Sequence, residues 1–235
     1  MKSKSKHKNY FSMSVEADTQ FEAELRKLFR KIKPTKIIET GTYLGQGTTI
    51  IIWRALQDLK INADFTTIEV NPFYYHQALL YFEHNRMQIK AELGLSIPRS
   101  MLPNKEEIVD KFVLNKEYES IYYDFSESER AELYFKETNF PVPDNLLYNA
   151  VQQYDFTPDF VLLDSSGHIG FIEFEYLLSL IRGDCYLMLD DIYHCKHYKS
   201  LQTIKSDPRF EIIVESPEKY GFCIAKFTYH SFGDD

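Results

Sequence analysis

The sequence predicts a single α/β domain built on a doubly wound, mostly parallel sheet of seven strands that ends in an antiparallel C-terminal hairpin. Three observations predict this fold. Short β-branched segments alternate with amphipathic segments of helical period, which is typical of βαβ units. A glycine-rich turn follows the first strand at residues 41–47. The link between the last two strands, residues 216–220, is short enough for an antiparallel pair.

The first half of the chain supplies three strands. A helix is expected from about Glu16 to Ile32, because apolar residues recur there at helical spacing and Pro34 follows. A later helix is expected after Asn71, where Pro72 stands at the first helical position. The expected strands, all short and rich in β-branched or apolar residues, are residues 36–40, 65–70 and 88–95, with a helix at residues 48–59.

An insertion is expected at about residues 100–155, where the alternation of strands and helices stops. Between Met101 and Phe140 there are ten Asp or Glu residues against five Lys or Arg. The segment is also rich in aromatic residues, which favour a partly helical, ordered lid over disorder. These aromatic residues are Tyr118, Tyr122, Tyr123, Phe125, Tyr134, Phe135 and Phe140.

The second half of the chain resumes the alternation. Two hydrophobic strands that end in acidic residues are expected at residues 159–164 and 185–190, and the hairpin strands at residues 210–215 and 221–228. Helices are expected at residues 171–181 and from about His194 to Ser206. The whole of residues 16–235 then forms one domain.

Charge and cysteine content limit the partners and the compartment. A formal net charge of -8 argues against a general nucleic-acid binder. Lysines at alternate positions make residues 1–15 a flexible basic tail, with a membrane-surface or phosphate contact as the alternative. Three cysteines without CxxC spacing indicate reduced thiols. With no signal peptide and no apolar run of membrane length, a cytoplasmic protein without a membrane partner is expected; whether it is a homo-oligomer is left open.

The glycine-rich turn carries the strongest functional signal. Gly41, Gly45 and Gly47 lie between a predicted strand and a predicted helix, at the sheet edge where doubly wound folds bind ligands. Their spacing is G-x3-G-x-G and not the dinucleotide pattern G-x-G-x-x-G. Glycines let the backbone turn tightly and approach a ligand closely. A purely structural turn is the alternative interpretation.

An acid at the end of the second strand supports the ligand-binding interpretation. Glu69 follows Gly45 by 24 positions. A carboxylate in this place can accept hydrogen bonds from both hydroxyls of a ribose. The alternative is an acid that only favours the N-terminal dipole of the next helix.

The loop and the acid together resemble the class I S-adenosylmethionine (SAM)-dependent methyltransferases, over about residues 36–228 apart from the insertion. The resemblance implies a Rossmann-like methyltransferase fold with SAM as cofactor. It implies that Glu39, Gly41, Thr42, Gly45 and Gly47 line the methionine half of SAM and that Ser96 lies near the adenine. The commoner motif of these enzymes is Asp-x-Gly-x-Gly-x-Gly, from which this chain departs.

Three acids form a second constellation. Asp164 ends the fourth strand, and Asp190 and Asp191 end the fifth, so their carboxylates are expected to converge at one sheet edge. Mg²⁺ would relieve their mutual repulsion and suits oxygen ligands. The arrangement is similar to metal-dependent O-methyltransferases of the catechol type and to macrolide and aminocoumarin sugar methyltransferases. Alternatively, Asp164 contacts cofactor or substrate while Asp190 and Asp191 cap the next helix.

Two histidines follow these acids and are candidate general bases. His168 and His194 could each take a proton from a substrate hydroxyl near neutral pH, and surface or capping positions are the alternative. His197 is expected to be exposed on a helix.

The functional hypothesis is an O-methyltransferase that acts on a small molecule or sugar-containing metabolite with the help of Mg²⁺. Two alternatives stay open. One is a metal-independent methyltransferase with His168 or Asp164 as base, which could also act on a nitrogen acceptor. The other is a cofactor-binding module without catalysis.

Overall fold

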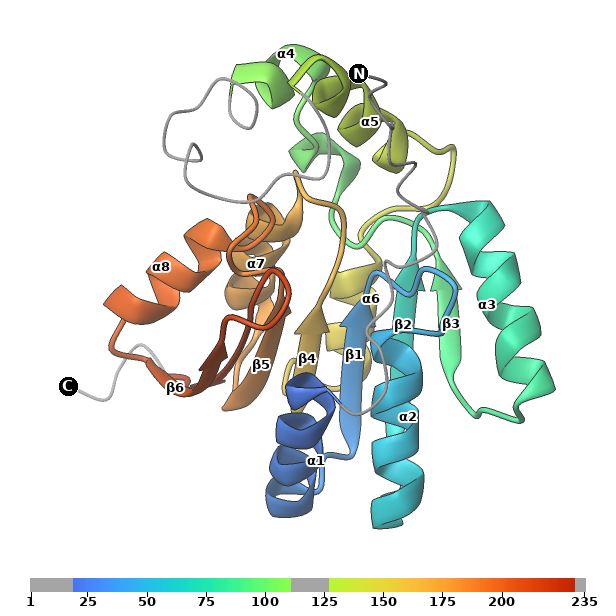
Figure 1. Ribbon diagram of the computed structural model, residues 1–235, viewed down its shortest axis with the longest axis vertical. Coiled ribbons are helices and arrows are strands. Elements are labelled where there is room, and N and C mark those ends of the chain that lie inside the picture. The colour runs from blue at the N-terminus through green and yellow to red at the C-terminus, as the bar shows by residue number, and fades with distance from the viewer. Residues whose placement is uncertain (1–18, 111–126, 231–235) are drawn as a thin grey trace, which may run out of the picture.

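A seven-stranded sheet in the order β3-β2-β1-β4-β5-β7-β6 forms the centre of the molecule (Figure 1). The computed structural model describes residues 19–110 and 127–230. The basic tail expected at residues 1–15 lies outside the described residues, as do Tyr118, Tyr122, Tyr123 and Phe125 of the insertion.

Six strands of the sheet run in one direction and β7 runs in the other. β1 pairs in parallel with both β2 and β4, β3 extends the sheet beyond β2, and β5 extends it beyond β4. β7 is antiparallel to both β5 and β6. The predicted mostly parallel sheet and its antiparallel hairpin are therefore confirmed. The strands are β1 Lys36–Thr40, β2 Asp64–Glu69, β3 Lys90–Leu93, β4 Phe160–Leu163, β5 Cys185–Asp190, β6 Phe210–Ser216 and β7 Phe222–Phe227.

Helices cover both faces of the sheet. α1 begins where the Thr19 hydroxyl accepts a hydrogen bond from the Glu22 amide, and α3 begins at Asn71, whose side chain accepts from the Phe73 amide. The helices of the frame are α1 Gln20–Ile32, α2 Thr48–Leu59, α3 Pro72–His84, α6 Leu146–Gln153, α7 Gly170–Leu180 and α8 Tyr198–Ser206. Among the described residues, no helix combines the length and the apolar character needed to span a membrane.

The side chains of the central strands alternate between two hydrophobic clusters, one on each face. In β1, Ile37 packs with the cluster under α1, α2 and α3, and Ile38 packs with the cluster under α6, α7 and α8. In β5, Met188 joins the first cluster while Leu187 and Leu189 join the second. This two-residue period is the strand geometry itself, and it explains why these segments are apolar throughout.

The described part of the insertion lies over the carboxyl ends of β1 and β4 (Figure 1). It contains the 3-10 helix η1 Arg99–Met101, α4 Lys105–Ile108 and α5 Glu127–Thr138. α6 follows and packs against the sheet, so the frame resumes at Leu146. A third, small hydrophobic cluster joins α4 and α5 to the loop after β5.

Candidate active site at the carboxyl edge of the sheet

Two glycines let the loop after β1 pack against its neighbours. Gly41 has φ +82°, and a Cβ there would lie 2.1 Å from the Asp164 carbonyl oxygen. Gly45 has φ +71°, and a Cβ there would lie 2.4 Å from the Phe82 ring. Gly47 is the N-cap of α2 and has no side chain to cap it. Any bulkier residue at Gly41 would push the loop away from the end of β4.

Glu39 lies under this loop and is fully buried. Its carboxylate accepts hydrogen bonds from the hydroxyls of Thr48, Thr49 and Thr67, all at 2.7 Å. Burial raises the pKa of Glu39 to about 7. The Thr42 hydroxyl lies 2.6 Å from that of Thr67. Glu39 and Thr42 therefore join the loop to β2 and to the start of α2.

Glu69 closes the other side of the loop. Its carboxylate accepts a hydrogen bond from the Tyr43 amide at 2.7 Å and from the Asn71 amide at 2.8 Å. Burial raises the pKa of Glu69 to about 7. Glu69 therefore joins the glycine loop to the start of α3, in the place where the sequence predicts a ribose-binding acid.

A second buried acid, Glu173 of α7, was not foreseen. Its carboxylate accepts hydrogen bonds from the hydroxyls of Thr40 at 2.8 Å and Ser165 at 2.9 Å, and from Ser96. Burial raises its pKa. Ser96, expected near adenine, is thus directed at Glu173. The signal in the sequence was an acid flanked by Ile172 and Phe174 on the buried side of an apolar helix.

The three acids predicted to converge do so. Asp164, Asp190 and Asp191 each offer a carboxylate oxygen, and these oxygens lie within 4.8 Å of one another. Asp191 has φ 58°, a left-handed conformation that Asp tolerates. Burial, followed by the charges of Asp191 and Asp164, raises the pKa of Asp190 well above its usual value.

A lysine that the sequence reading overlooked lies among these acids. The ammonium Nζ of Lys196 is 2.6 Å from Oδ1 of Asp164 and 2.7 Å from Oδ2 of Asp191. Only 6% of the residue is exposed. Burial opposes the charge of Lys196, but the neighbouring carboxylates outweigh it and raise its pKa well above the usual value. Lys196 therefore places a cation of the chain itself between two of the three acids, Asp164 and Asp191.

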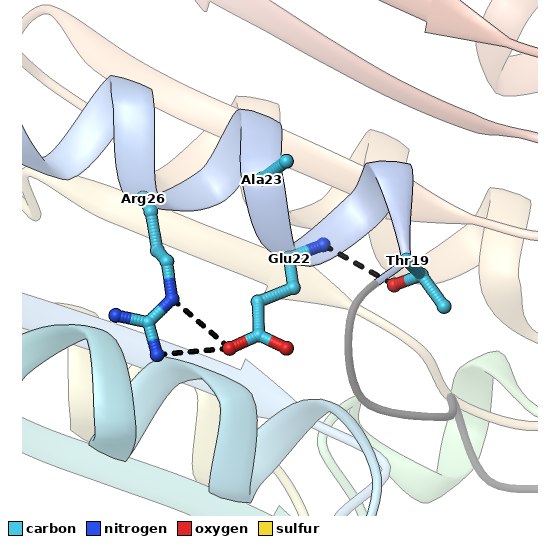
Figure 2. A pocket seen from close by; sticks show the side chains of 4 residues that line it. All are labelled: Thr19, Glu22, Ala23 and Arg26. Carbon is cyan, nitrogen blue, oxygen red and sulfur yellow. Dashed lines mark hydrogen bonds and ion pairs between the residues drawn. The ribbon is translucent and has the colours of Figure 1, made fainter.

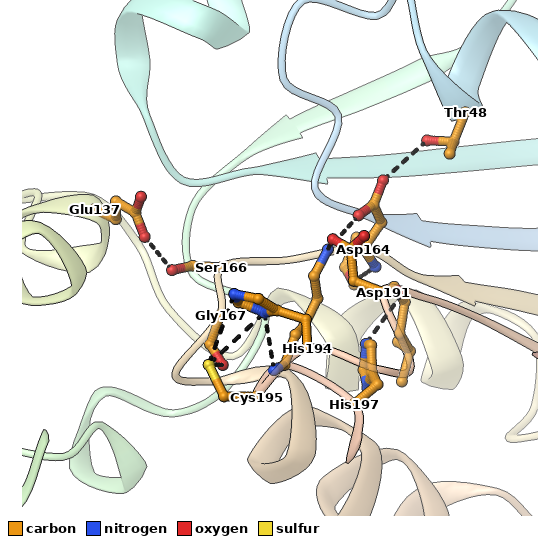
Figure 3. Close-up of polar contacts among 12 residues, drawn as sticks. Thr48, Glu137, Asp164, Ser166, Gly167, Asp191, His194, Cys195 and His197 are labelled. Carbon is orange, nitrogen blue, oxygen red and sulfur yellow. Dashed lines mark hydrogen bonds and ion pairs between the residues drawn. The ribbon is translucent and has the colours of Figure 1, made fainter. Parts of the chain in front are cut away.

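Both candidate histidine bases are buried. His168 is 1% exposed and lies between the hydroxyls of Thr138 and Ser166, each 3.2 Å from a ring nitrogen. Burial lowers the pKa of His168 to about 3, so its ring is neutral at physiological pH. His194 accepts a hydrogen bond from the Lys196 amide at 3.2 Å (Figure 3).

The expectation that His197 is exposed was wrong. The residue is fully buried, with Nε2 3.2 Å from the Leu163 carbonyl oxygen and Nδ1 3.1 Å from the Ser200 hydroxyl. The cause is local, because residues 191–197 form turns and α8 begins only at Tyr198. These turns bring Lys196 and His197 inward, whereas a helix from His194 would have spread them around its axis.

The fold has many counterparts among solved structures, although no protein-family model and no curated protein matches the sequence. An O-methyltransferase from Bacillus cereus in complex with SAH has 14% identity and a TM-score of 0.54, over 91% of this chain and 83% of that one. The O-methyltransferase TomG from Streptomyces achromogenes, involved in tomaymycin synthesis and in complex with SAM, has 13% identity and a TM-score of 0.52, over 92% and 82%. A methyltransferase from Geobacter sulfurreducens has 13% identity and a TM-score of 0.54, over 91% and 81%.

The chain has the class I methyltransferase fold. Within this methyltransferase fold, the glycine loop, Glu69 and the acid cluster all lie at the carboxyl ends of the parallel strands. That edge is where open α/β sheets bind their ligands.

α5 covers the loops of the methyltransferase fold that carry the histidines. The Tyr134 ring stacks on the His168 ring with 5.3 Å between centroids, and its hydroxyl lies 3.2 Å from Sγ of Cys195. Glu137 accepts a hydrogen bond from the Ser166 hydroxyl (Figure 3). α5 is thus attached to the loop after β4 and to the loop after β5, which places part of the insertion over the candidate site.

A separate hollow of about 350 Å³ lies beside α1 (Figure 2). Its lining residues are Thr19, Glu22, Ala23 and Arg26. The Arg26 guanidinium donates to the Glu22 carboxylate at 2.9 Å, so the polar groups there are paired with each other. None of the predicted site residues lines this hollow, and it carries no argument about function.

Proposed function

We propose that the chain is a SAM-dependent methyltransferase that acts on a hydroxyl group of a small molecule. The observation that carries the proposal is the closure of the glycine loop on Glu69, through the Tyr43 amide, at the carboxyl edge of a methyltransferase fold. Solved structures of this fold contain SAM or SAH. Glu69 would accept hydrogen bonds from the ribose, and the loop of Gly41–Gly47 would support the methionine half.

When bound, SAM supplies an electrophilic methyl group on a sulfonium. The protein then has three tasks, which are to align the acceptor oxygen with the methyl carbon, to exclude water and to accept the acceptor's proton. Two buried acids, Glu39 and Glu173, hold the loops that form the site, and α5 lies over it. This rigid support favours precise alignment.

Asp164 is the best supported of the three candidate bases. Its side chain is 19% exposed, whereas His168 and His194 are almost wholly buried. The low pKa of His168 makes it a weak proton acceptor. The carboxylate of Asp164 also lies 3.5 Å from the Thr48 hydroxyl, beside the start of α2 (Figure 3).

Assistance by Mg²⁺ is the least supported part of the hypothesis. The convergence of three acids speaks for it, but the Lys196 ammonium contacts two of those acids where a metal would be held. We therefore propose that methyl transfer proceeds without a resident divalent ion.

The three buried cysteines are free thiols, which supports a reducing compartment such as the cytoplasm.

Calorimetric titration with SAM and with SAH tests the proposal first. Saturable binding of both is expected, followed by transfer of a labelled methyl group to members of a panel of phenols, sugars and amines. Absence of SAM and SAH binding would refute the proposed function. Binding without transfer to any acceptor would favour the non-catalytic cofactor-binding module.

A further inference from the structure

We infer that Lys196 is the permanent cation of this site: its ammonium takes the place of a divalent ion among the three acids and presents its remaining N–H to the oxygen of the methyl acceptor. The part of this inference that concerns the acceptor rests on the proposed methyltransferase function. Metal exclusion depends only on the position of the ammonium among the three acids.

The ammonium of Lys196 lies between two of the acids. Lys196 Nζ donates a charge-assisted hydrogen bond to Asp164 at 2.6 Å and forms an ion pair with Asp191 at 2.7 Å. Asp164 directly follows β4 and Asp191 directly follows β5. Both belong to the cluster of three acids whose carboxylate oxygens lie within 4.8 Å of one another. An ion bound by the same oxygens would have to displace the ammonium from both.

The lysine side chain is held in this place. Its backbone amide donates to Nδ1 of His194 at 3.2 Å. Its stem passes Gly170 at the start of α7, where a Cβ would lie only 2.6 Å from Cγ of Lys196. Any other residue at position 170 would collide with this stem and with the Lys196 carbonyl oxygen, so Gly170 leaves the room that the lysine occupies.

The ammonium has hydrogen-bonding capacity left over. A protonated lysine has three N–H groups; one donates to Asp164, and the contact with Asp191 is an ion pair, so at least one N–H is not used. Among the residues that the structure describes, the ammonium makes no other hydrogen bond or ion pair. A buried donor without a partner is costly, so this N–H is expected to meet an oxygen of a ligand at the carboxyl edge.

The chemistry of the acceptor follows from this donor. A cation that donates a hydrogen bond to a hydroxyl oxygen favours the ionised form of that hydroxyl, as a bound metal would. An amine in its ammonium form has no lone pair and cannot accept such a bond. The site therefore selects an oxygen acceptor with an ionisable hydroxyl, such as a phenol or an enol, over an amine.

Titration with Mn²⁺, followed by electron paramagnetic resonance, tests metal exclusion without any need for activity. The intact protein is expected to bind Mn²⁺ at least about tenfold more weakly than Lys196→Ala, because removal of the ammonium leaves the acids without their cation. Lys205→Ala removes an exposed lysine of α8 and is the matched control; it should behave like the intact protein.

Two results would overturn metal exclusion. One is tight stoichiometric binding of Mn²⁺ by the intact protein, which needs no variant and therefore stands even if Lys196→Ala does not fold. The other is a folded Lys196→Ala protein that binds Mn²⁺ no better than the intact protein.

Steady-state kinetics test the acceptor contact. Activity of the intact protein is expected to be unchanged by a chelator. Lys196→Ala should raise the KM for the acceptor about tenfold or more, the effect of one charge-assisted hydrogen bond, with SAM affinity unchanged. Lys196→Arg, which keeps the charge, should recover part of the loss. Activity lost in chelator and restored by Mg²⁺ would overturn the inference, whereas absence of SAM binding would refute the proposed function and leave the Mn²⁺ result intact.

Discussion

Buried carboxylates dominate the site at the scale of single residues. Glu39 accepts hydrogen bonds from three threonine hydroxyls. Glu173 accepts hydrogen bonds from hydroxyls of three different segments, and Glu69 accepts them from two backbone amides. A buried polar group stabilises a fold only when its hydrogen bonds are satisfied. These acids therefore connect the loops that follow β1, β2, β3 and β4 into one rigid edge.

The pH dependence of stability should report the burial of Glu39. Its pKa rises from 4.5 to about 7 on folding, so between these values the folded state holds a proton that the unfolded chain has released. Stability should therefore fall as pH rises through this window, by about 3 kcal/mol in total at about 1.4 kcal/mol per pKa unit. Glu39→Gln cannot ionise and should lose this contribution.

Urea unfolding of both proteins at pH 5 and pH 7.5 measures the difference. The loss of stability between the two pH values should be smaller in Glu39→Gln than in the intact protein. Identical losses would mean that Glu39 ionises normally inside the fold. Glu69 and Asp190, whose pKa values are also raised, contribute equally to both proteins and cancel in the comparison.

Glu69→Ala should weaken the binding of SAM. The loss of charge-assisted hydrogen bonds to a ribose is expected to cost about 1.5–3 kcal/mol, which is roughly a 10- to 150-fold rise in Kd. Calorimetry on the variant measures it, with Glu211→Ala on the exposed side of β6 as control. An unchanged Kd would remove the ribose assignment and leave Glu69 as a brace between the loop and α3.

The sequence allowed the acids of the site to be predicted, but not their partners. Asp164, Asp190 and Asp191 could be placed because adjacent parallel strands end at the same edge. Lys196 could not, because its position depends on the turns of residues 191–197, which have no periodicity. Reading that segment as helical from His194 onward hid both the buried lysine and the burial of His197.

At the scale of elements, the loop after β1 and the end of β4 constrain each other. A Cβ at Gly41 would lie 2.1 Å from the Asp164 carbonyl oxygen, and φ there is +82°. Gly41→Ala should therefore lower the free energy of unfolding by about 2–4 kcal/mol through strain and collision. It should also displace Asp164 and so reduce methyl transfer.

Gly183→Ala is the matched control for this substitution. A Cβ at Gly183 would lie 3.0 Å from the side chain of Thr157, which can give way, and φ there is not positive. Urea unfolding should show little change for Gly183→Ala and a large loss for Gly41→Ala. Equal effects of the two substitutions would show that the loop can move away from β4 at little cost.

Most of the frame was predictable because its strands are short apolar runs that alternate with helical segments. α6 was not, because it lies inside the segment predicted as an insertion. The positions of α4 and α5 were not predictable either, because they depend on contacts with loops distant in the sequence. Tyr134, for instance, was seen as one aromatic residue among many, and only the fold pairs it with His168 and Cys195.

At the scale of the whole molecule, the hydrophobic core has unequal parts. Two large clusters lie on the two faces of the sheet. Among the described residues, α4 and α5 join the loop after β5 through a small cluster of buried side chains, Ile108, Ala131, Tyr134 and Cys195. Small clusters open locally at lower free energy than the main core. α5 is therefore expected to exchange its amide hydrogens faster than β1, β4 and β5.

Binding of SAM together with an acceptor should slow that exchange, because ligands would hold α5 over the site. Hydrogen exchange monitored by mass spectrometry, with and without ligands, measures it. The amides of α1, which lies on the flank of the sheet, serve as the internal reference. Strong protection of α5 both with and without ligand would instead identify a fixed structural element.

The position of β7 between β5 and β6 has a consequence for folding during synthesis on the ribosome. A chain emerges from its N-terminus first, yet β6 can join the sheet only through β7, which is made after it. Until Phe222–Phe227 has emerged, β5 keeps a bare edge whose neighbouring side chains, Leu187 and Leu189, are apolar, and such an edge invites pairing with other chains. The sheet of the nascent chain is therefore incomplete until β7 pairs with both β5 and β6.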